Sequence, residues 1–571
     1  MKKVLLTIGL IALLVTAASI VCFASGTVLP TANADTTVTM STIFADDMVF
    51  QANEPINVFG FCETEGATIK VTLGRSTGEA TVQDGKWSVS LPAMEYRKGL
   101  TLTVEEQGLA SAKPIRFKNI AIGEVWVLSG QSNGYYEFYK LEDSIEHRNN
   151  ADNFGDNIRV FTETKTILHT EKNLKYGEGE WHILTSDRLK YTGEHHNVSA
   201  VAYIAATKMA AEFGNDVPIA IINTVVSGSS LKAWLPPEVM QTKEPTEYAN
   251  YLEQKAYFAQ HGEFIPESSP HSKYASLIYE VDVKPYSGFT AKGVIWWQGE
   301  SDCNNTNTEM YPGRFSVLRD AFRTVFSNED MYFFVVQLHP YGTTNVNGVA
   351  NFRNMQMSDE FASEEEKTYV IASGYEGMTL ANMEFAHNTS DGGFVHNARK
   401  SPVGLRIANA ILDKAYGYYT EDETAPAIVS IERRANGVII TFDSDICTMF
   451  DNELHGFEIA AANGTYYPAK AHVEGNVVTL TSEKVTVPAK VRYSYATVIL
   501  VLKDGTEIEY TTSSSTFIKE LPSSAGIIVQ NTDGKQYKLA KDAYYSVRTR
   551  LKGNVTNASG IPLCAFEYTV N

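Results

Sequence analysis

The chain has 571 residues, of which 44% are hydrophobic and 20% are charged, and its formal net charge is −19. This composition is ordinary for a folded protein, and the length predicts about three or four domains. The excess of acidic residues argues against nucleic acid and anionic membrane surfaces as partners.

Residues 1–34 have the pattern of a signal peptide. Lys2 and Lys3 precede a long apolar run, and cleavage is expected after Ala24 or Ala34. The alternative is an uncleaved membrane anchor, because the run is just long enough to span a bilayer. No later stretch is apolar enough to do so. We therefore expect a secreted, cell-surface or periplasmic protein with no membrane contact beyond a possible uncleaved leader.

Residues 35–118 are expected to form a β-sandwich. Short segments of alternating apolar and polar residues are separated by turn signals such as Asp84-Gly85, which is typical of small antiparallel sandwiches. The segments are 56–61, 68–73, 87–91 and 100–104.

Residues 119–420 are expected to form a three-layer α/β/α domain. The strand candidates are continuous apolar runs, as in a parallel sheet that helices cover on both faces. Residues 135–197 have weak periodicity and are interpreted as a long excursion over the sheet edge. The strand candidates are 125–129, 219–224, 293–297, 332–338 and 368–372, and the helix candidates are 198–213, 312–326 and 402–416.

Residues 421–571 return to a β pattern, with strands expected at 428–433, 437–442, 477–480 and 490–495. The cysteines after the leader are scattered and have no histidine at zinc spacing. Cys447 and Cys564 could pair, and four buried thiols are an equally good interpretation. The four are Cys62, Cys303, Cys447 and Cys564.

Ser132 is the leading candidate for a catalytic residue. An apolar run ends in Gly130-Gln131-Ser132-Asn133, which would present one hydroxyl at the C-terminal edge of the sheet. Open α/β sheets bind ligands at that edge, and a serine there is a candidate nucleophile if a base can reach it. Most serines in turns only hydrogen-bond the local backbone, but the position at a strand end favours the catalytic interpretation.

His396 is the candidate base. It follows the last expected strand and precedes the helix that starts near Pro402, so it belongs to the same sheet edge as Ser132. His339, directly after the strand expected at 332–338, is the second choice.

Two further turns could supply donors to the oxyanion that forms when an ester is attacked. Gly228 follows one strand candidate and lets the backbone approach a ligand, and Gln298 follows another and can donate from its amide. Each could also be an ordinary βα turn. Glu300 and Asp302 could instead suggest a two-carboxylate glycosidase site, but they lie on one loop, whereas such pairs usually come from separate elements.

In its motifs the chain resembles the sialate O-acetylesterase family of SGNH-type hydrolases over nearly its whole length. The resemblance implies an SGNH-like α/β domain flanked by β-sandwich-like regions. It also implies a carbohydrate O-acetylesterase that uses no cofactor and no metal, with O-acetylated sialic acid as the leading substrate. The matching blocks are 43–51, 123–133, which ends in Gly-Gln-Ser-Asn, 296–301, which reads Trp-Trp-Gln-Gly-Glu-Ser, 335–338, 353–356 and 557–562, with His396, Lys400, Gly404 and Arg406.

The resemblance implies roles for individual residues. Ser132 would be the nucleophile and His396 the base, and Gly228, Gln298 and the Ser132 amide would form the oxyanion hole. Arg353 is a candidate to contact a substrate carboxylate, because arginine offers a bidentate fork, and a structural ion pair is equally consistent. Glu300 is a second candidate for substrate binding.

The chain departs from the family around the histidine. No aspartate lies two or three residues before His396; the nearest acid is Asp391, which would orient His396 unless a backbone carbonyl does so. Residues 499–548 look like an insertion. Two alternatives stay open: an esterase acting on acetylated xylan or another glycan, and a carbohydrate-binding protein whose esterase site has decayed.

Overall fold

The computed structural model describes residues 36–109, 112–141, 143–162, 175–190, 198–214, 216–262, 274–339, 346–373, 384–386, 395–396, 400–418, 424–449, 453–495, 497–502, 507–510, 527–530, 536–539, 545–550 and 553–570. The expected leader at residues 1–34 lies outside this part of the chain. Among the described helices none is both long and apolar enough to cross a membrane.

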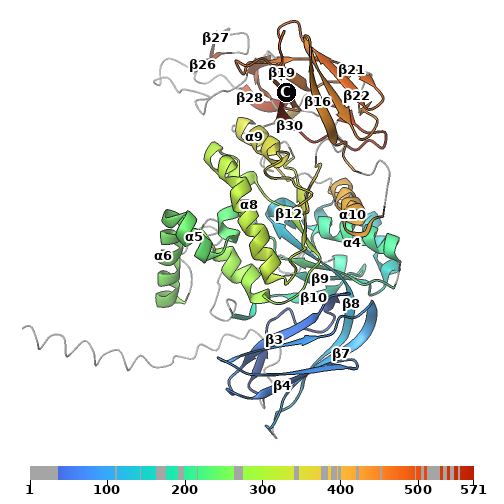
Figure 1. Cartoon of the computed structure of the whole chain (residues 1–571), viewed down its shortest axis with the longest axis vertical. Coiled ribbons are helices and arrows are strands. Elements are labelled where there is room, and N and C mark those ends of the chain that lie inside the picture. The colour runs from blue at the N-terminus through green and yellow to red at the C-terminus, as the bar shows by residue number, and fades with distance from the viewer. Residues whose placement is uncertain are drawn as a thin grey trace, which may run out of the picture.

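A parallel sheet forms the centre of the molecule (Figure 1). Its inner strands are buried along nearly their whole length, as expected for a sheet covered by helices, whereas its two edge strands are partly exposed. All neighbouring pairs are parallel except β9 and β10. In spatial order the strands are β10 (Glu180–Ile183), β9 (Ile158–Thr162), β11 (Ile219–Asn223), β8 (Ile115–Gly130), β12 (Gly293–Trp297), β13 (Tyr332–Val336) and β14 (Thr368–Ile371).

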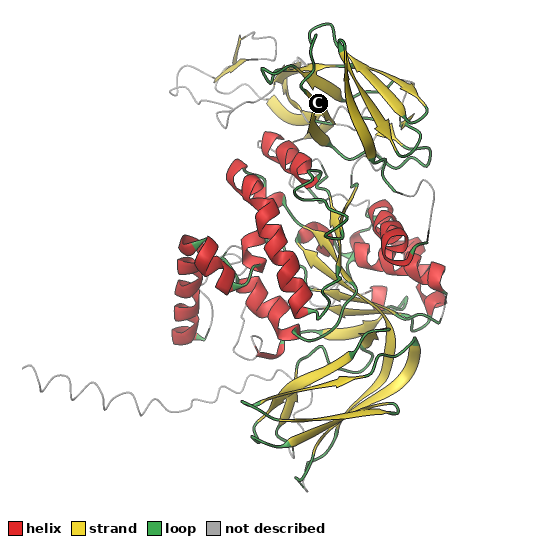
Figure 2. Cartoon of the chain, viewed as in Figure 1, coloured by secondary structure: helices red, strands yellow, loops and turns green. Residues whose placement is uncertain are grey.

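Helices cover both faces of this sheet, which confirms the expected three-layer arrangement (Figure 2). Helix α4 (Ala200–Phe213) packs against α10 (Ser401–Tyr416) on one face, and α8 (Asn305–Val325) and α9 (Val346–Gln356) lie on the other. Two further helices, α5 (Pro237–Lys243) and α6 (Pro245–His261), lie on the side of α8 that faces away from the sheet (Figure 1).

Helix α8 begins earlier than the sequence predicts. The side chain of Asn304 accepts a hydrogen bond from the Asn307 amide, so the first turn is capped there, and Pro312 lies inside the helix rather than at its start. A proline inside a helix removes one backbone donor, and this makes it a poor guide to where α8 starts.

The edge strands β9 and β10 correct the prediction for residues 135–197, which sequence reasoning placed over the sheet edge. Strand β9 contains Arg159, which hides its apolar character in the sequence. The guanidinium is nonetheless fully buried and donates to the carbonyl oxygens of Asp47, Asn119 and Asp156. Arg159 therefore ties the sheet to the N-terminal β region through hydrogen bonds that satisfy a buried charge.

The N-terminal β region shares strand β8 with the central sheet. The first part of β8 pairs antiparallel with β7 (Arg97–Glu106), and its second part pairs parallel with β11 and β12. Residue 119, the expected start of the central domain, lies inside this strand. One continuous apolar core joins both regions. The other strands of the region are β1 (Val38–Met40), β2 (Val49–Gln51), β3 (Ile56–Cys62), β4 (Thr68–Leu73), β5 (Ser76–Thr81) and β6 (Lys86–Leu91).

The C-terminal β region has a separate apolar core. One sheet is formed by β16 (Ile428–Arg434), β17 (Gly437–Phe442), β22 (Val477–Thr481) and β21 (Lys470–Glu474), and another by β20 (Tyr466–Pro468), β19 (Phe457–Ala460), β23 (Lys490–Tyr493) and β30 (Phe566–Thr569). In the expected insertion, β24 (Thr497–Leu502) and β28 (Tyr545–Arg550) pair with each other, and β28 also pairs with β15 (Glu384–Ala386).

The cysteines of the described chain form no disulfide bond. Cys62, Cys303, Cys447 and Cys564 are all free thiols, so Cys447 and Cys564 do not pair.

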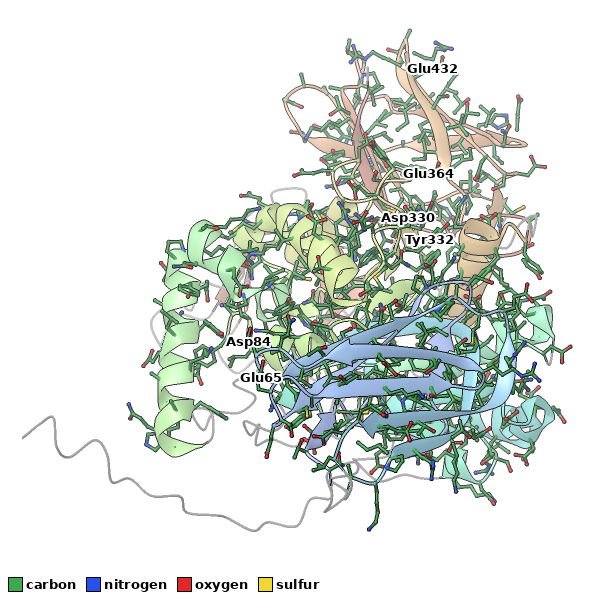
Figure 3. All side chains as sticks on the ribbon, turned by 60° about the horizontal axis from the view of Figure 1, so that its bottom comes forward. Glu65, Asp84, Asp330, Tyr332, Glu364 and Glu432 are labelled. Atoms are coloured by element: carbon green, nitrogen blue, oxygen red, sulfur yellow. The ribbon has the colours of Figure 1, made fainter. Side chains whose placement is uncertain are left out.

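Exposed carboxylates such as Glu65, Asp84, Asp330, Glu364 and Glu432 lie on the outside of all parts of the molecule (Figure 3). The negative charge is therefore spread over the surface.

Candidate active site

Three turns meet at the C-terminal edge of β8, β11 and β12. Gly130 ends β8 with φ of 122°, and a Cβ there would lie 2.2 Å from the carbonyl oxygen of Trp297. Only glycine fits this position, because the backbone conformation and the close approach both exclude a side chain. The Gln131 amide then donates to the Trp297 carbonyl at 2.7 Å. These two features fix the turn that presents Ser132.

Ser132 and His396 are in contact. The Oγ of Ser132, at the start of the short helix α1 (Ser132–Tyr135), lies 2.7 Å from Nε2 of His396. Ser132 is half-buried and His396 is exposed, so solvent and substrate can reach the pair. This distance is that required for a histidine to take the proton of an attacking serine. Asp391, expected to orient His396, lies outside the described residues.

The backbone offers two donors beside Ser132. Gly228 has φ of 71°, and a Cβ built there would meet nothing within 4 Å, so its backbone borders open space. In the described part of the chain, no group accepts a hydrogen bond from the N–H of Ser132 or of Gly228. Both amides therefore remain available to an oxygen that gains negative charge.

Gln298 does not fit the role expected for it. Its side chain is fully buried, and both amide hydrogens are used: Nε2 donates to the Ser229 carbonyl at 2.9 Å and to Asp302 Oδ2 at 2.6 Å. Its Oε1 accepts from the Tyr311 hydroxyl at 2.7 Å. The sequence predicted a donor to substrate from position alone, but the buried Asp302 carboxylate turns the amide inward.

Asp302 holds the second and third turns together. Besides Gln298, its carboxylate accepts from the Leu231 amide at 2.8 Å and from Nδ2 of Asn307 at 3.2 Å. Burial raises the pKa of Asp302, and the hydrogen bonds from Leu231 and Gln298 act in the opposite direction. The carboxylate is thus a structural acceptor, and the arrangement does not support the glycosidase alternative, in which it would face a cleft.

Asn133 is a site residue that sequence reasoning did not assign, although it directly follows Ser132. Its side chain is fully buried, and Nδ2 donates to Glu300 Oε1 at 2.6 Å and to the Val395 carbonyl at 2.9 Å. Its Oδ1 accepts from Nζ of Lys400 at 2.6 Å. One carboxamide therefore connects the serine turn, the turn after β12, and the segment that carries His396.

Glu300 and Lys400 belong to this same cluster. Burial raises the pKa of Glu300, and its Oε2 is buried with no hydrogen-bond partner among the described residues. Lys400 is 1% exposed, and burial lowers its pKa to about 7, against the opposing effect of Glu300. Lys400 also lies over the Trp297 ring, 4.4 Å from its centroid. Glu300 was expected to bind substrate. In the structure its Oε1 instead accepts a hydrogen bond from Asn133.

Arg353 lies elsewhere. It is 2% exposed on α9 and donates from Nη1 to the Ser494 carbonyl at 3.3 Å, in the C-terminal β region. A guanidinium buried between two regions is not accessible to a substrate carboxylate. Among the described residues its contact is a hydrogen bond to a backbone carbonyl rather than the structural ion pair that the sequence also allowed. His339, the second choice of base, is also buried, at 4% exposed.

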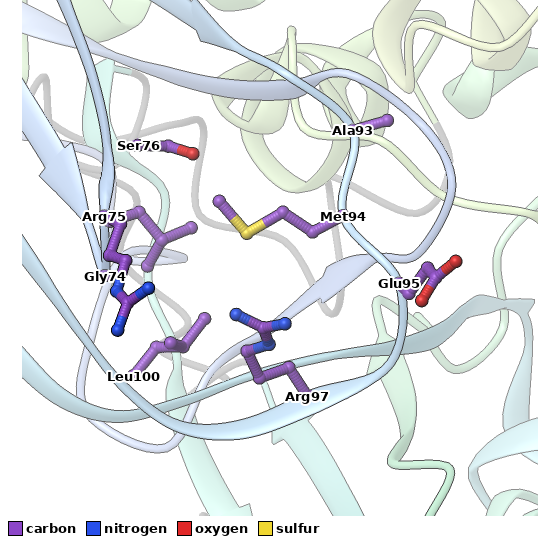
Figure 4. A pocket seen from close by; sticks show the side chains of 9 residues that line it. Gly74, Arg75, Ser76, Ala93, Met94, Glu95, Arg97 and Leu100 are labelled. Carbon is purple, nitrogen blue, oxygen red and sulfur yellow. The ribbon is translucent and has the colours of Figure 1, made fainter.

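The described part of the chain shows no group of three or more His, Cys, Asp or Glu residues arranged to hold a metal ion. A cavity of about 260 Å³ lies in the N-terminal β region, where Arg75, Met94 and Arg97 line it (Figure 4). None of the residues around Ser132 borders this cavity.

The central part of the chain is similar to known carbohydrate esterases. Residues 122–395 match the family model of carbohydrate esterases described as sialic acid-specific acetylesterases. Sialate O-acetylesterase of Pongo abelii is 26% identical over 291 residues, covering 49% of this chain and 52% of the relative. The enzyme of Rattus norvegicus is 23% identical over 445 residues, covering 71% and 79%. The chain thus spans about half the length of the Pongo abelii and Homo sapiens relatives it matches.

A solved structure shares the fold. A carbohydrate acetylesterase from Xanthomonas citri superimposes with a TM-score of 0.65 at 21% identity, over 93% of this chain and 99% of that chain. The common fold therefore includes the flanking β regions as well as the central sheet. Together these matches confirm the resemblance to the sialate O-acetylesterase family.

Proposed function

We propose that the chain is a carbohydrate O-acetylesterase, with Ser132 as nucleophile and His396 as general base. The observation that carries the proposal is the 2.7 Å contact between Ser132 Oγ and His396 Nε2, at the sheet edge where the amides of Ser132 and Gly228 have no acceptor among the described residues. The match of residues 122–395 to acetylesterases supports it.

In the proposed reaction, Ser132 Oγ attacks the acetyl carbonyl while His396 Nε2 takes the hydroxyl proton. The amides of Ser132 and Gly228 donate to the oxyanion. The bond between the acetyl carbon and the sugar oxygen then breaks, and His396 gives the proton to that oxygen, which leaves as the sugar hydroxyl. Water attacks the acetyl-enzyme with His396 again acting as base, and acetate and free Ser132 result.

O-acetylated sialic acid is the substrate we favour, and acetylated xylan or another glycan is the alternative. The preference rests on the family match, because Arg353, the candidate for the sialate carboxylate, is buried at 2% exposed. We further propose that residues 1–34 direct secretion, as their pattern indicates. Sequencing of the N-terminus of protein recovered from the culture medium tests this: an intact Met1 would contradict cleavage.

The activity is tested by acetate release from 9-O-acetylated N-acetylneuraminic acid and from acetylated xylan. We expect release by the wild type and by Ser287→Ala, an exposed control whose hydroxyl donates to the Lys284 carbonyl, and none by Ser132→Ala. The preferred substrate separates the two glycan classes. No release from either substrate or from an aryl acetate would favour the carbohydrate-binding alternative, and activity in Ser132→Ala would contradict the site.

A further inference from the structure

We propose that Asn133 is a positioning residue that holds His396 against Ser132, and that Lys400 fixes the orientation of the Asn133 carboxamide. The inference rests on the proposed function, because it assigns to His396 the role of base. Asn133 itself does not touch the reacting atoms.

The key contact is the hydrogen bond from Asn133 Nδ2 to the Val395 carbonyl, at 2.9 Å. That carbonyl belongs to the peptide that joins Val395 to His396. Because a peptide unit is planar, fixing the carbonyl also fixes the direction in which the chain enters His396. Asn133 directly follows Ser132, so one short stretch of backbone carries the nucleophile and the group that anchors the base.

The orientation of the carboxamide is determined by its other partners. A side-chain amide has two N–H donors and one carbonyl oxygen, and here each has a partner of the right kind. Nδ2 donates to Glu300 Oε1 as well as to Val395, and Oδ1 accepts from Lys400 Nζ. Turning the amide over would place Oδ1 against two acceptors and Nδ2 against the Lys400 amine. The Glu300 and Lys400 contacts therefore select the orientation that donates to Val395.

Lys400 is itself held in place. It is the residue before α10, and its amine lies over the rings of Trp297 and Tyr136, at 4.4 and 5.2 Å from their centroids. Since Trp297 ends β12, the cluster is anchored to the central sheet. Through Asn133 and Lys400, the position of the exposed His396 is thereby connected to the central sheet.

The chemistry gives the expected size of the effect. Proton transfer depends on the distance and direction between the base and the hydroxyl, and a misplacement of about 1 Å can lower the rate about 10²-fold. Loss of the anchor should lower kcat and leave KM nearly unchanged, because the fully buried Asn133 side chain is not accessible to a substrate.

The test is Asn133→Ala in the full-length chain, with Asn328→Ala as the matched control. Asn328 also donates from Nδ2 to a carbonyl, that of Ala291 at 2.9 Å, remote from Ser132. We expect kcat to fall about 10²-fold with KM within about twofold, and the control to match the wild type. An unchanged kcat, or a loss confined to KM, would overturn the proposal. If Asn133→Ala does not fold, Asn133→Asp removes the donor in the same shape and is judged by the same criteria.

A crystal structure of the variant provides a readout that does not depend on activity. We expect the separation of Ser132 Oγ and His396 Nε2 to exceed hydrogen-bonding range. A retained contact contradicts the positioning role even if the wild type proves to have no esterase activity, so the failure of this inference is distinguishable from failure of the proposed function. Lys400→Met keeps the apolar stem and should lower kcat less than Asn133→Ala does. The control Lys414→Met, at the exposed end of α10, should leave kcat unchanged.

Discussion

Asp302 Oδ2 lies 2.6 Å from Nε2 of Gln298, and this contact directs the Gln298 amide, in the turn after β12, into the protein. The residue whose sequence position suggested an oxyanion donor is directed into the protein, where it supports the turn that carries Gly228 through the Ser229 carbonyl. The proposed donors to a substrate oxygen are therefore the backbone amides of Ser132 and Gly228. The buried Asp302 carboxylate holds the turns in place through its hydrogen bonds to Leu231 and Gln298.

We expect Asp302→Asn to destabilise the protein. The substitution brings an amide donor among the Leu231, Gln298 and Asn307 donors, so at least one buried group loses its partner, at a cost of about 1–3 kcal/mol in the free energy of unfolding. Urea unfolding followed by tryptophan fluorescence measures this, with Asp330→Asn on the surface as control. Stability equal to the control would contradict the role of Asp302.

Gly130→Ala should disrupt the serine turn. The new Cβ would lie 2.2 Å from the Trp297 carbonyl oxygen, at a φ that side chains rarely adopt. We expect little soluble protein, or loss of esterase activity in what folds. Gly313→Ala, in the exposed part of α8 with nothing within 4 Å of the Cβ, should keep full activity and gain up to about 1 kcal/mol in stability. Normal activity in Gly130→Ala would show that the turn can rearrange.

Arg353→Met should affect stability and leave the KM for O-acetylated sialic acid unchanged. The guanidinium donates to the buried Ser494 carbonyl, so its removal is expected to cost about 1–3 kcal/mol. Thermal unfolding and steady-state kinetics on the same preparation separate the two effects. A raised KM for O-acetylated sialic acid with a normal KM for acetylated xylan would indicate instead that Arg353 binds the sialate carboxylate.

The contribution of Lys400 to stability should depend on pH. Its pKa is lowered from 10.5 to about 7 by burial, so between these values the unfolded chain holds a proton that the folded chain lacks. Unfolding takes up that proton, and raising the pH disfavours the uptake. The free energy of unfolding of the wild type relative to Lys400→Met should therefore rise from pH 7 to 10, by at most about 1.4 kcal/mol per pH unit. A constant or falling difference would contradict the lowered pKa.

Local patterns in the sequence were sufficient to predict the layers of the fold. Apolar runs mark β8, β11, β12, β13 and β14, because strands buried on both faces must be apolar along their length. Strand β9 was missed, since burial of Arg159 depends on the carbonyl groups of Asp47 and Asn119, which come from distant parts of the chain. The hydrophobic periodicity of a segment does not indicate hydrogen-bond partners that come from distant parts of the chain.

The same division holds at the site. The sequence by itself determined that Ser132, Gly228 and His396 would follow strands at one sheet edge, because parallel strands place their carboxyl ends together. Only the tertiary structure decided that Gln298 turns inward, that Arg353 is buried against the C-terminal region, and that Asn133, Glu300 and Lys400 form one cluster. The physical reason is that the direction of a polar side chain is set by whichever buried partners it must satisfy, and those partners are assembled by packing rather than by neighbouring residues.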